Sequence, residues 1–358
     1  MTDFKALKND RMTSEERMTA LLKGNPIDRV PLYHFILGFC ARNTGSPLDV
    51  IYKDPGQSFQ VQSQTLEQYG FDGGPDYGYA SYGGWEFGGD IKFPSGEYEQ
   101  GPTHGGFLVQ SEDDVWNLKL PEVKTAGFIP LAMEFSKLQD KSGKPVSIVL
   151  GGNFTIAGNI CPVATLCRWI LKKPELVHRI MELTTEHVVQ VIQYWADTFG
   201  AERIVPNLWE PLATNDIISP WHFKEYVFPY IKESSEKILA TGIKHIYYHV
   251  CGDQNLNLPY WAEIPTGNPG LISVGHQISL TDAIKYFGNN NVIIGNVDGN
   301  IIRKGSARQV YEHCQKCIEE AKFAPRGYML MSGCEIPPMS PPANVYAMRK
   351  AINDFGWY

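Results

Sequence analysis

The chain has 358 residues, of which 43% are hydrophobic and 20% are charged. This length and composition exclude a disordered chain, a collagen-like repeat and a coiled coil, and they suit either two domains or one large α/β barrel. A net charge of −7 argues against nucleic acid and membrane surfaces as partners, because both are anionic.

The seven cysteines are spread along the chain without the spacing of a small disulfide-bonded domain. An odd number of widely spaced cysteines predicts reduced thiols in the cytoplasm and raises the question of which thiols bind a metal. The first 24 residues are polar, and no run of 18 apolar residues occurs, so we expect neither a secretory signal nor a membrane span.

The N-terminal part combines one helix with long irregular stretches. A capping-box pattern at Ser14, followed by apolar residues at helical spacing up to Gly24, predicts a helix within an extension over residues 1–28. Strands are expected at 29–36 and 69–73. Residues 70–106 are rich in Gly, Tyr and Trp and have no helical period, which favours an ordered aromatic cover over the rest of the domain.

From residue 145 onward, short apolar runs alternate with amphipathic stretches. This alternation indicates βαβ units with parallel strand pairing. Together with the two earlier strands, the total of eight favours a single α/β domain over residues 1–358, folded as a (β/α)8 TIM barrel. The expected later strands are 145–154, 203–210, 244–252, 270–277, 292–299 and 328–335, and the expected helices are 161–172, 174–199, 220–242, 279–288, 303–324 and 341–355.

Each later strand ends in a polar or glycine-rich tail, and in a barrel these tails meet at one mouth, where active sites of this fold lie. His249 and Cys251 are two residues apart, so their side chains can face one centre, and Cys334 ends the last strand. One imidazole and two thiolates suit Zn²⁺ and leave a fourth coordination position open, as in catalytic zinc sites. The alternative is that the two thiols only pack in the barrel.

Other residues of the tails are weaker candidates. Glu335 is expected to point away from Cys334, since neighbours on a strand face opposite sides. It would then support the metal ligands without binding the metal itself. Cys314 and Cys317 lie on one helical stripe and, like Cys40, Cys161 and Cys167, are assigned to packing. The side chains that could orient a substrate or fill the fourth metal position are Asn207, Glu210, His276, Gln277 and Asp298.

Five segments carry a resemblance to a known family: GGNFTIAGN, EPLATNDIISPWHFKEYVFPYIK, YYHVCGD, VIIGNVDG and SGCEIPPMSPPANVYAMRKAI. In this order they resemble the uroporphyrinogen decarboxylase superfamily, whose fold is a (β/α)8 barrel. The HVCG and GCE segments resemble its zinc- and cobalamin-dependent methyltransferase branch, and this resemblance implies that His249, Cys251 and Cys334 bind zinc.

The decarboxylases of the superfamily differ from this chain at two places. They carry an arginine-rich segment after the first strand, where this chain reads LYHFILGFCARNTG with Arg42 alone, and they have Gly-His in place of Gly333-Cys334. A polycarboxylate substrate requires cationic side chains, so decarboxylation of uroporphyrinogen is not expected.

The resemblance implies methyl transfer between a methylated small molecule and a corrinoid. The chain lacks the D-x-H-x-x-G motif of corrinoid domains, so the corrinoid is expected on a separate partner protein. The aromatic segment resembles members that demethylate aryl methyl ethers, with Tyr77 and Trp85 as candidate ring-binding residues, although packing of the cover is an alternative role for them. A methylcobalamin:thiol methyltransferase and a non-catalytic zinc-containing binding protein remain alternatives. The oligomeric state is left open.

Overall fold

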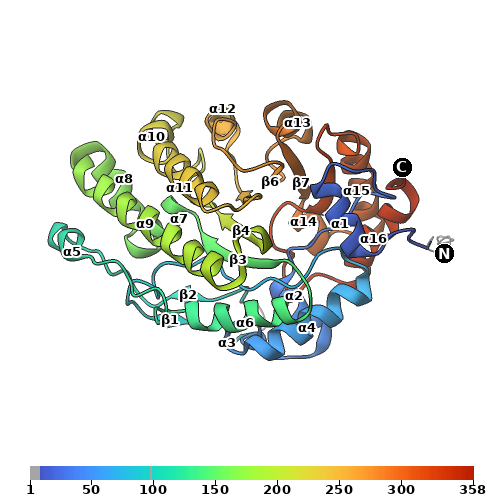
Figure 1. Ribbon diagram of the computed structural model, residues 1–358, viewed down its shortest axis with the longest axis horizontal. Helices are drawn as coiled ribbons and strands as arrows, with labels where there is room; N and C mark the ends of the chain where they lie inside the picture. The colour runs from blue at the N-terminus through green and yellow to red at the C-terminus, as the bar shows by residue number, and fades with distance from the viewer. Residues whose placement is uncertain (1–8, 97–98) are drawn as a thin grey trace.

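The computed structural model describes residues 9–96 and 99–358, and a six-stranded parallel sheet forms its centre (Figure 1). The strands pair in the order in which they follow each other along the chain, as βαβ units require. All six strands expected after residue 145 are confirmed. They are β3 (Val146–Gly151), β4 (Ile204–Trp209), β5 (Tyr247–Val250), β6 (Gly270–Val274), β7 (Asn291–Val297) and β8 (Tyr328–Ser332).

Helices connect the strands and surround the sheet, most of them close to the predicted positions. They are α7 (Asn153–Ile160), α8 (Val163–Lys172), α9 (Pro174–Phe199), α10 (Pro220–Tyr226), α11 (Phe228–Ala240), α12 (Leu258–Trp261), α13 (Leu280–Phe287), α14 (Gly299–Lys304), α15 (Ala307–Ala321) and α16 (Pro342–Phe355), with short 3₁₀ helices at Ala201–Arg203 and Asn255–Asn257. The helices Asn153–Ile160 and Leu258–Trp261 were not predicted.

Two stretches predicted as single helices are each broken into two. The stretch 220–242 breaks at Val227, because α11 begins immediately afterwards with Pro229 in its first turn, where proline is favoured. The stretch 303–324 breaks at Gly305, after which Ser306 forms a capping box with Gln309 and begins α15.

The N-terminal part is helical and wraps around one side of the sheet (Figure 1). Thr13, rather than the predicted Ser14, caps the first helix together with Glu16. Ser14 instead accepts a hydrogen bond from the backbone N–H of Gly73. Residues 1–8 of the predicted extension lie outside the described residues. The helices are α1 (Ser14–Leu22), α2 (Leu37–Thr44), α3 (Val50–Lys53), α4 (Pro55–Tyr69), α5 (Glu112–Asn117) and α6 (Ile129–Lys141).

The strands predicted at 29–36 and 69–73 are not formed, although both segments lie where strands would close the barrel. Leu32 bridges Leu330 of β8 in parallel, but Pro31 has no N–H to donate and limits the ladder. The N–H of Asp72 donates to the carbonyl of Leu32, which places the second segment beside the first. Tyr69 belongs to α4, and Gly73, Gly74 and Pro75 disfavour a strand after it.

Side chains, rather than a backbone ladder, join the residues just after this second segment, 74–78, to β3. The hydroxyl of Ser147 donates to Asp76 at 2.7 Å. A Cβ atom at Gly78 would lie 2.4 Å from the side chain of Val149, so only glycine allows the segment to approach β3 this closely. The (β/α)8 class is therefore realised with six regular strands and two irregular segments.

The aromatic cover contains one short antiparallel pair, β1 (Ile91–Lys92) with β2 (Thr103–His104), and is otherwise irregular in the described residues. The buried carboxylate of Glu86 accepts hydrogen bonds from the hydroxyl of Tyr79 at 2.8 Å and from the N–H of Gly83 at 2.6 Å and of Phe128 at 3.2 Å. Burial raises the pKa of Glu86. This single acid holds two parts of the cover against the start of α6.

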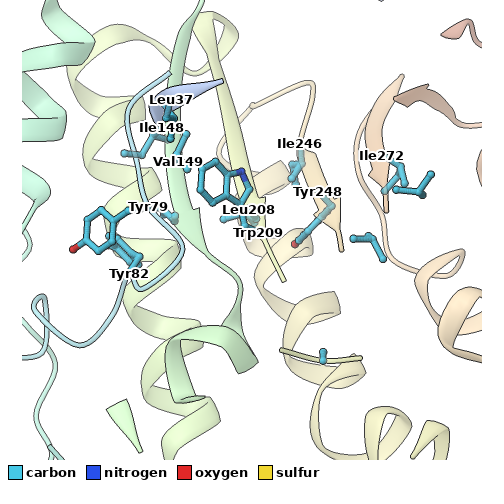
Figure 2. Packing of buried hydrophobic residues seen from close by; sticks show 14 of the residues in the cluster. Leu37, Tyr79, Tyr82, Ile148, Val149, Leu208, Trp209, Ile246, Tyr248 and Ile272 are labelled. Atoms are coloured by element: carbon cyan, nitrogen blue, oxygen red, sulfur yellow. The ribbon is translucent and has the colours of Figure 1, made fainter. Parts of the chain in front are cut away.

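Figure 2 shows how Tyr79 and Tyr82 of the cover join the hydrophobic core beside β3. Ile148 and Val149 on β3 and Leu208 and Trp209 on β4 belong to the same buried cluster. Within the described chain, no single helix is long and apolar enough to cross a membrane. The bent pair α7 and α8 reaches the required length and hydropathy only together, with an angle of 106° between its two halves.

Candidate metal centre

Three predicted metal ligands meet at the carboxyl ends of two strands. His249 lies in β5, Cys251 follows that strand directly, and Cys334 comes two residues after β8. One ligand atom from each residue can be chosen so that all three lie within 4.8 Å of one another, and the two sulfur atoms are 3.5 Å apart. The fold therefore brings together residues that are 83 positions apart in the chain.

The imidazole of His249 is held in one orientation and has a free nitrogen. Its Nδ1 lies 2.9 Å from the hydroxyl of Ser273, the residue opposite His249 in the β5–β6 pairing. Its Nε2 is buried and has no hydrogen-bond partner among the described residues. A buried polar atom without a partner is costly, and binding a metal ion would satisfy it.

The two thiols differ in how readily they ionise. The hydrogen bond with Cys334 lowers the pKa of Cys251, whereas the same contact and burial raise the pKa of Cys334 well above its usual value. Two thiolates this close repel each other unless a cation lies between them. One imidazole nitrogen and two sulfurs therefore fit Zn²⁺, with a coordination position left for a substrate.

A buried amide fixes the loop that carries Cys251. The side-chain N–H₂ of Gln254 donates to the carbonyl oxygens of Glu210 and Cys251, at 3.0 and 3.3 Å. Its oxygen accepts from the indole of Trp261 at 2.6 Å. Gln254 and Ser273 carry no signal in the sequence, because neither residue belongs to a recognisable motif and both act through contacts between strands or loops.

Glu210 directly follows β4, whereas Asn207 is the fourth residue of that strand, and both are buried with internal partners. The carboxylate of Glu210 accepts from the N–H of Phe154 at 3.0 Å and from the hydroxyl of Thr155, so it caps α7. Burial raises the pKa of Glu210 to about 7. The amide oxygen of Asn207 accepts a hydrogen bond at 2.8 Å from the indole of Trp209, which lies two residues further along β4 on the same face.

Glu335 supports the loop around Cys334. Its carboxylate accepts from the N–H of Gly38 at 3.0 Å and from the side chain of Gln100 at 3.2 Å. Burial raises the pKa of Glu335 to about 7. These contacts tie the chain after β8 to α2 and to the cover.

The candidates on β6 and β7 lie at the exposed rim. His276 and Gln277 follow β6, and Nδ1 of His276 lies 3.8 Å from the carboxylate of Asp298, which also caps α14. A Cβ atom at Gly333 would lie 2.8 Å from the backbone nitrogen of His276. The residue before Cys334 thus packs directly on the chain that follows β6.

The two aromatic candidates of the cover occupy different surroundings. The ring of Tyr77 stacks between Phe128 and Phe135, with centroids 4.5 and 4.7 Å away, and its hydroxyl donates to the carbonyl of Tyr52. Both of its faces are therefore occupied by protein. Trp85 is half-buried and meets the ring of Phe93 edge-on at 5.9 Å. Within the described residues, neither ring stacks on His249 of the metal cluster.

We expect substitution of Ser273 to weaken metal binding without removing it. Ser273→Ala deletes the group that orients His249, and loss of such a partner typically lowers metal affinity about 10- to 100-fold. Competition with a chromophoric zinc chelator measures the change. Ser235→Ala is a matched control, since it deletes a buried hydroxyl that bonds to Tyr248 instead. Equal affinities in the two variants would contradict the role given to Ser273.

The fold and the site define a class, namely a parallel α/β barrel with a His–Cys–Cys cluster at the carboxyl ends of its strands. The profile of the uroporphyrinogen decarboxylase (URO-D) family matches residues 13–355. The chain therefore belongs to this family.

Several curated relatives are methyltransferases. The methylated-thiol–coenzyme M methyltransferase of Methanosarcina mazei is 29% identical over 61% of this chain and 56% of its own length. The methylcobamide:CoM methyltransferase MtaA of Methanosarcina barkeri is 27% identical over 63% of this chain and 64% of its own length. These alignments thus span less than two thirds of each relative.

Other similar proteins cover nearly the whole chain. The uroporphyrinogen decarboxylase of Anaeromyxobacter sp. (strain Fw109-5) is 23% identical over 95% of this chain and 99% of its own length. A solved methyltransferase structure from Methanosarcina mazei superposes with a TM-score of 0.81 and 21% identity, covering 96% of this chain and 99% of that one. At this identity the structural match supports the fold, which agrees with the barrel expected from the sequence.

Proposed function

We propose that this protein is a zinc-dependent methyltransferase that moves a methyl group from a methylated small molecule to the cobalt of a corrinoid on a separate protein. The observation that carries the proposal is the cluster of His249, Cys251 and Cys334, with one buried imidazole nitrogen unpartnered beside two thiols. Zinc held there would supply a Lewis acid for the atom that leaves the methyl group.

The chain's own residues prepare this site. Ser273 orients the imidazole of His249, Gln254 fixes the loop after Cys251, and Glu335 secures the chain at Cys334. The three ligands come from the ends of parallel strands, where a substrate and a second protein can both approach. The relatives named for methylcobamide support a corrinoid as the methyl carrier.

An aryl methyl ether is the preferred methyl donor. The strand tails at the mouth contain no lysine or arginine, which a sulfonated thiol would require. Half-buried Trp85 in the cover offers an aromatic surface of the kind that an aryl ring would use. The names of the coenzyme M methyltransferase relatives favour the alternative, transfer from methylcobalamin to a thiol.

An absorption experiment separates these reactions. We expect the zinc-loaded protein to convert cobalt(I) cobalamin to methylcobalamin in the presence of methoxylated aromatics, while the Cys334→Ala variant does not. Demethylation of methylcobalamin by coenzyme M, without reaction of any aryl ether, would establish the thiol alternative. Zinc binding without either reaction would favour a non-catalytic binding protein.

A further inference from the structure

A second cavity lies at the end of the barrel opposite to the metal centre. Its volume is about 110 Å³, and it is lined by residues near the beginnings of the strands and by α1. Ser147, Val205 and Leu271 are each the second residue of their strand, and Tyr247 is the first residue of β5. His249 and Cys251 lie toward and beyond the other end of β5, and Cys334 follows the other end of β8, so the two sites are distinct.

The walls of this cavity are mostly apolar. Met18 and Leu22 of α1 face Leu271, Ile294 and Met329 of the barrel across the cavity. These side chains pack together as a small cluster, separate from the main core. An apolar cavity of this size accommodates about four to five non-hydrogen atoms, judging from the binding of benzene in a cavity of roughly 150 Å³.

One corner of the cavity carries a buried carboxylate. Asp76 is 8% exposed, and its Oδ1 accepts from the hydroxyl of Ser147 at 2.7 Å. Within residues 9–96 and 99–358, no lysine, arginine or histidine forms an ion pair with Asp76. Burial raises the pKa of Asp76, as expected for an acid without a cationic partner.

The basic residues near Asp76, His34 and Lys144, form no ion pair with it. Nε2 of His34 is bonded to the carbonyl of Gly74, and burial lowers the pKa of this histidine, so it is neutral near pH 7. Glu15 and Lys144 line the cavity as well, Glu15 with an exposed side chain and Lys144 with a half-buried one. Because neither His34 nor Lys144 pairs with Asp76 in the described part of the chain, a cation from outside the chain would stabilise the ionised carboxylate.

Two tyrosine rings line the same cavity and could contact a bound cation. The rings of Tyr33 and Tyr247 line the cavity with centroids 6.3 Å apart and an interplanar angle of 74°. Aromatic faces attract ammonium groups, most strongly where water is excluded. A carboxylate, two aromatic rings and apolar walls are together the surroundings that suit an alkylammonium ion.

We propose that this cavity is a binding site for a small organic cation, such as a short protonated amine or a tetraalkylammonium ion, with its charge on Asp76 between Tyr33 and Tyr247. The site is separate from the metal centre and does not depend on the function proposed for it.

Calorimetry with a matched pair of ligands tests the charge preference. Tetramethylammonium and tert-butanol have similar sizes, but only the first is a cation. We expect tetramethylammonium to bind the full chain at least 10-fold more tightly than tert-butanol, whether or not zinc is bound. Equal binding of both would overturn the assignment to a cation, and no binding of either would show that the cavity holds only water.

Two variants locate the site. Asp76→Asn keeps the shape but removes the charge, and it should weaken tetramethylammonium binding at least 10-fold without weakening tert-butanol binding. Met18→Phe fills the cavity from α1 and should abolish binding of both, and it serves alone if Asp76→Asn does not fold. Unchanged tetramethylammonium binding in a folded variant of either kind would place the ligand elsewhere and overturn the proposal.

Discussion

Cys334→Ala is expected to abolish zinc binding and methyl transfer together. The purified wild-type protein should contain about one zinc per chain, because His249, Cys251 and Cys334 supply three ligands within 4.8 Å of one another. The variant keeps only His249 and Cys251, and two protein ligands hold zinc far more weakly than three. Elemental analysis after dialysis against a weak chelator measures the loss.

The control for this prediction is another partly exposed thiol. Cys167 lies in α8, contacts the carbonyl of Ile217 and takes no part in the cluster. Cys167→Ala should therefore retain zinc and activity. If Cys334→Ala kept full zinc occupancy, or if both variants lost zinc equally, the proposed ligand set would be wrong.

The cluster could be predicted because its geometry follows from local rules. His249 and Cys251 are two residues apart at the end of a strand, and side chains at that spacing share a face. Cys334 joins them because the ends of parallel strands meet at one mouth. Neither inference requires the exact pairing of one strand with the next.

Ser273 and Gln254 could not be predicted in this way. Ser273 contacts His249 only because the register of β5 on β6 places the two residues opposite each other, and the sequence does not show that register. Gln254 reaches the carbonyl of Glu210, 44 residues away, through the fold of a loop. Tertiary contacts set the positions of the residues that support a site, whereas local spacing along the strands is enough to place its ligands.

The N-terminal part was the least predictable part of the fold. Apolar residues between 29 and 36 resemble a strand, but Pro31 limits hydrogen bonding and the segment makes only isolated bridges. A buried ion-pair network secures this segment, and it joins residues far apart in the chain, such as Arg17 and Asp72, which are 55 positions apart. Charge pairing at such separation leaves no periodic pattern in the sequence.

Replacement of Arg17 is expected to lower the free energy of unfolding strongly. The Arg17 side chain is fully buried and bonds to Asp28 at 2.7 Å and to Asp72 at 2.6 Å. Asp72 also bonds to Arg29 and to the N–H of Leu32. This network joins α1 to both irregular segments that close the barrel. Its loss would therefore destabilise the side of the barrel that has no regular strands.

Arg17→Met keeps the length of the side chain but leaves two buried carboxylates short of a positive charge. Breaking a buried ion pair in this way costs about 3–5 kcal/mol, which urea denaturation can measure. Arg308→Met is the control, since Arg308 pairs with Glu312 on the exposed face of α15 and should contribute about 0.5 kcal/mol or less. Similar losses in the two variants would contradict the structural role of Arg17.

The pH dependence of this difference gives an independent check. Burial alone would raise the pKa values of Asp10 and Asp28, but hydrogen bonds and the charges of Arg29 and Arg17 lower the pKa of Asp10 to about 2 and also lower that of Asp28. Acids with lowered pKa values stabilise the fold above their unfolded pKa, near 4, and lose this effect as the pH falls toward 2. The stability difference between the wild type and Arg17→Met should therefore be largest near neutral pH and shrink as the pH falls toward 2. A difference that persisted unchanged at pH 3 would mean that Arg17 stabilises the barrel by packing alone.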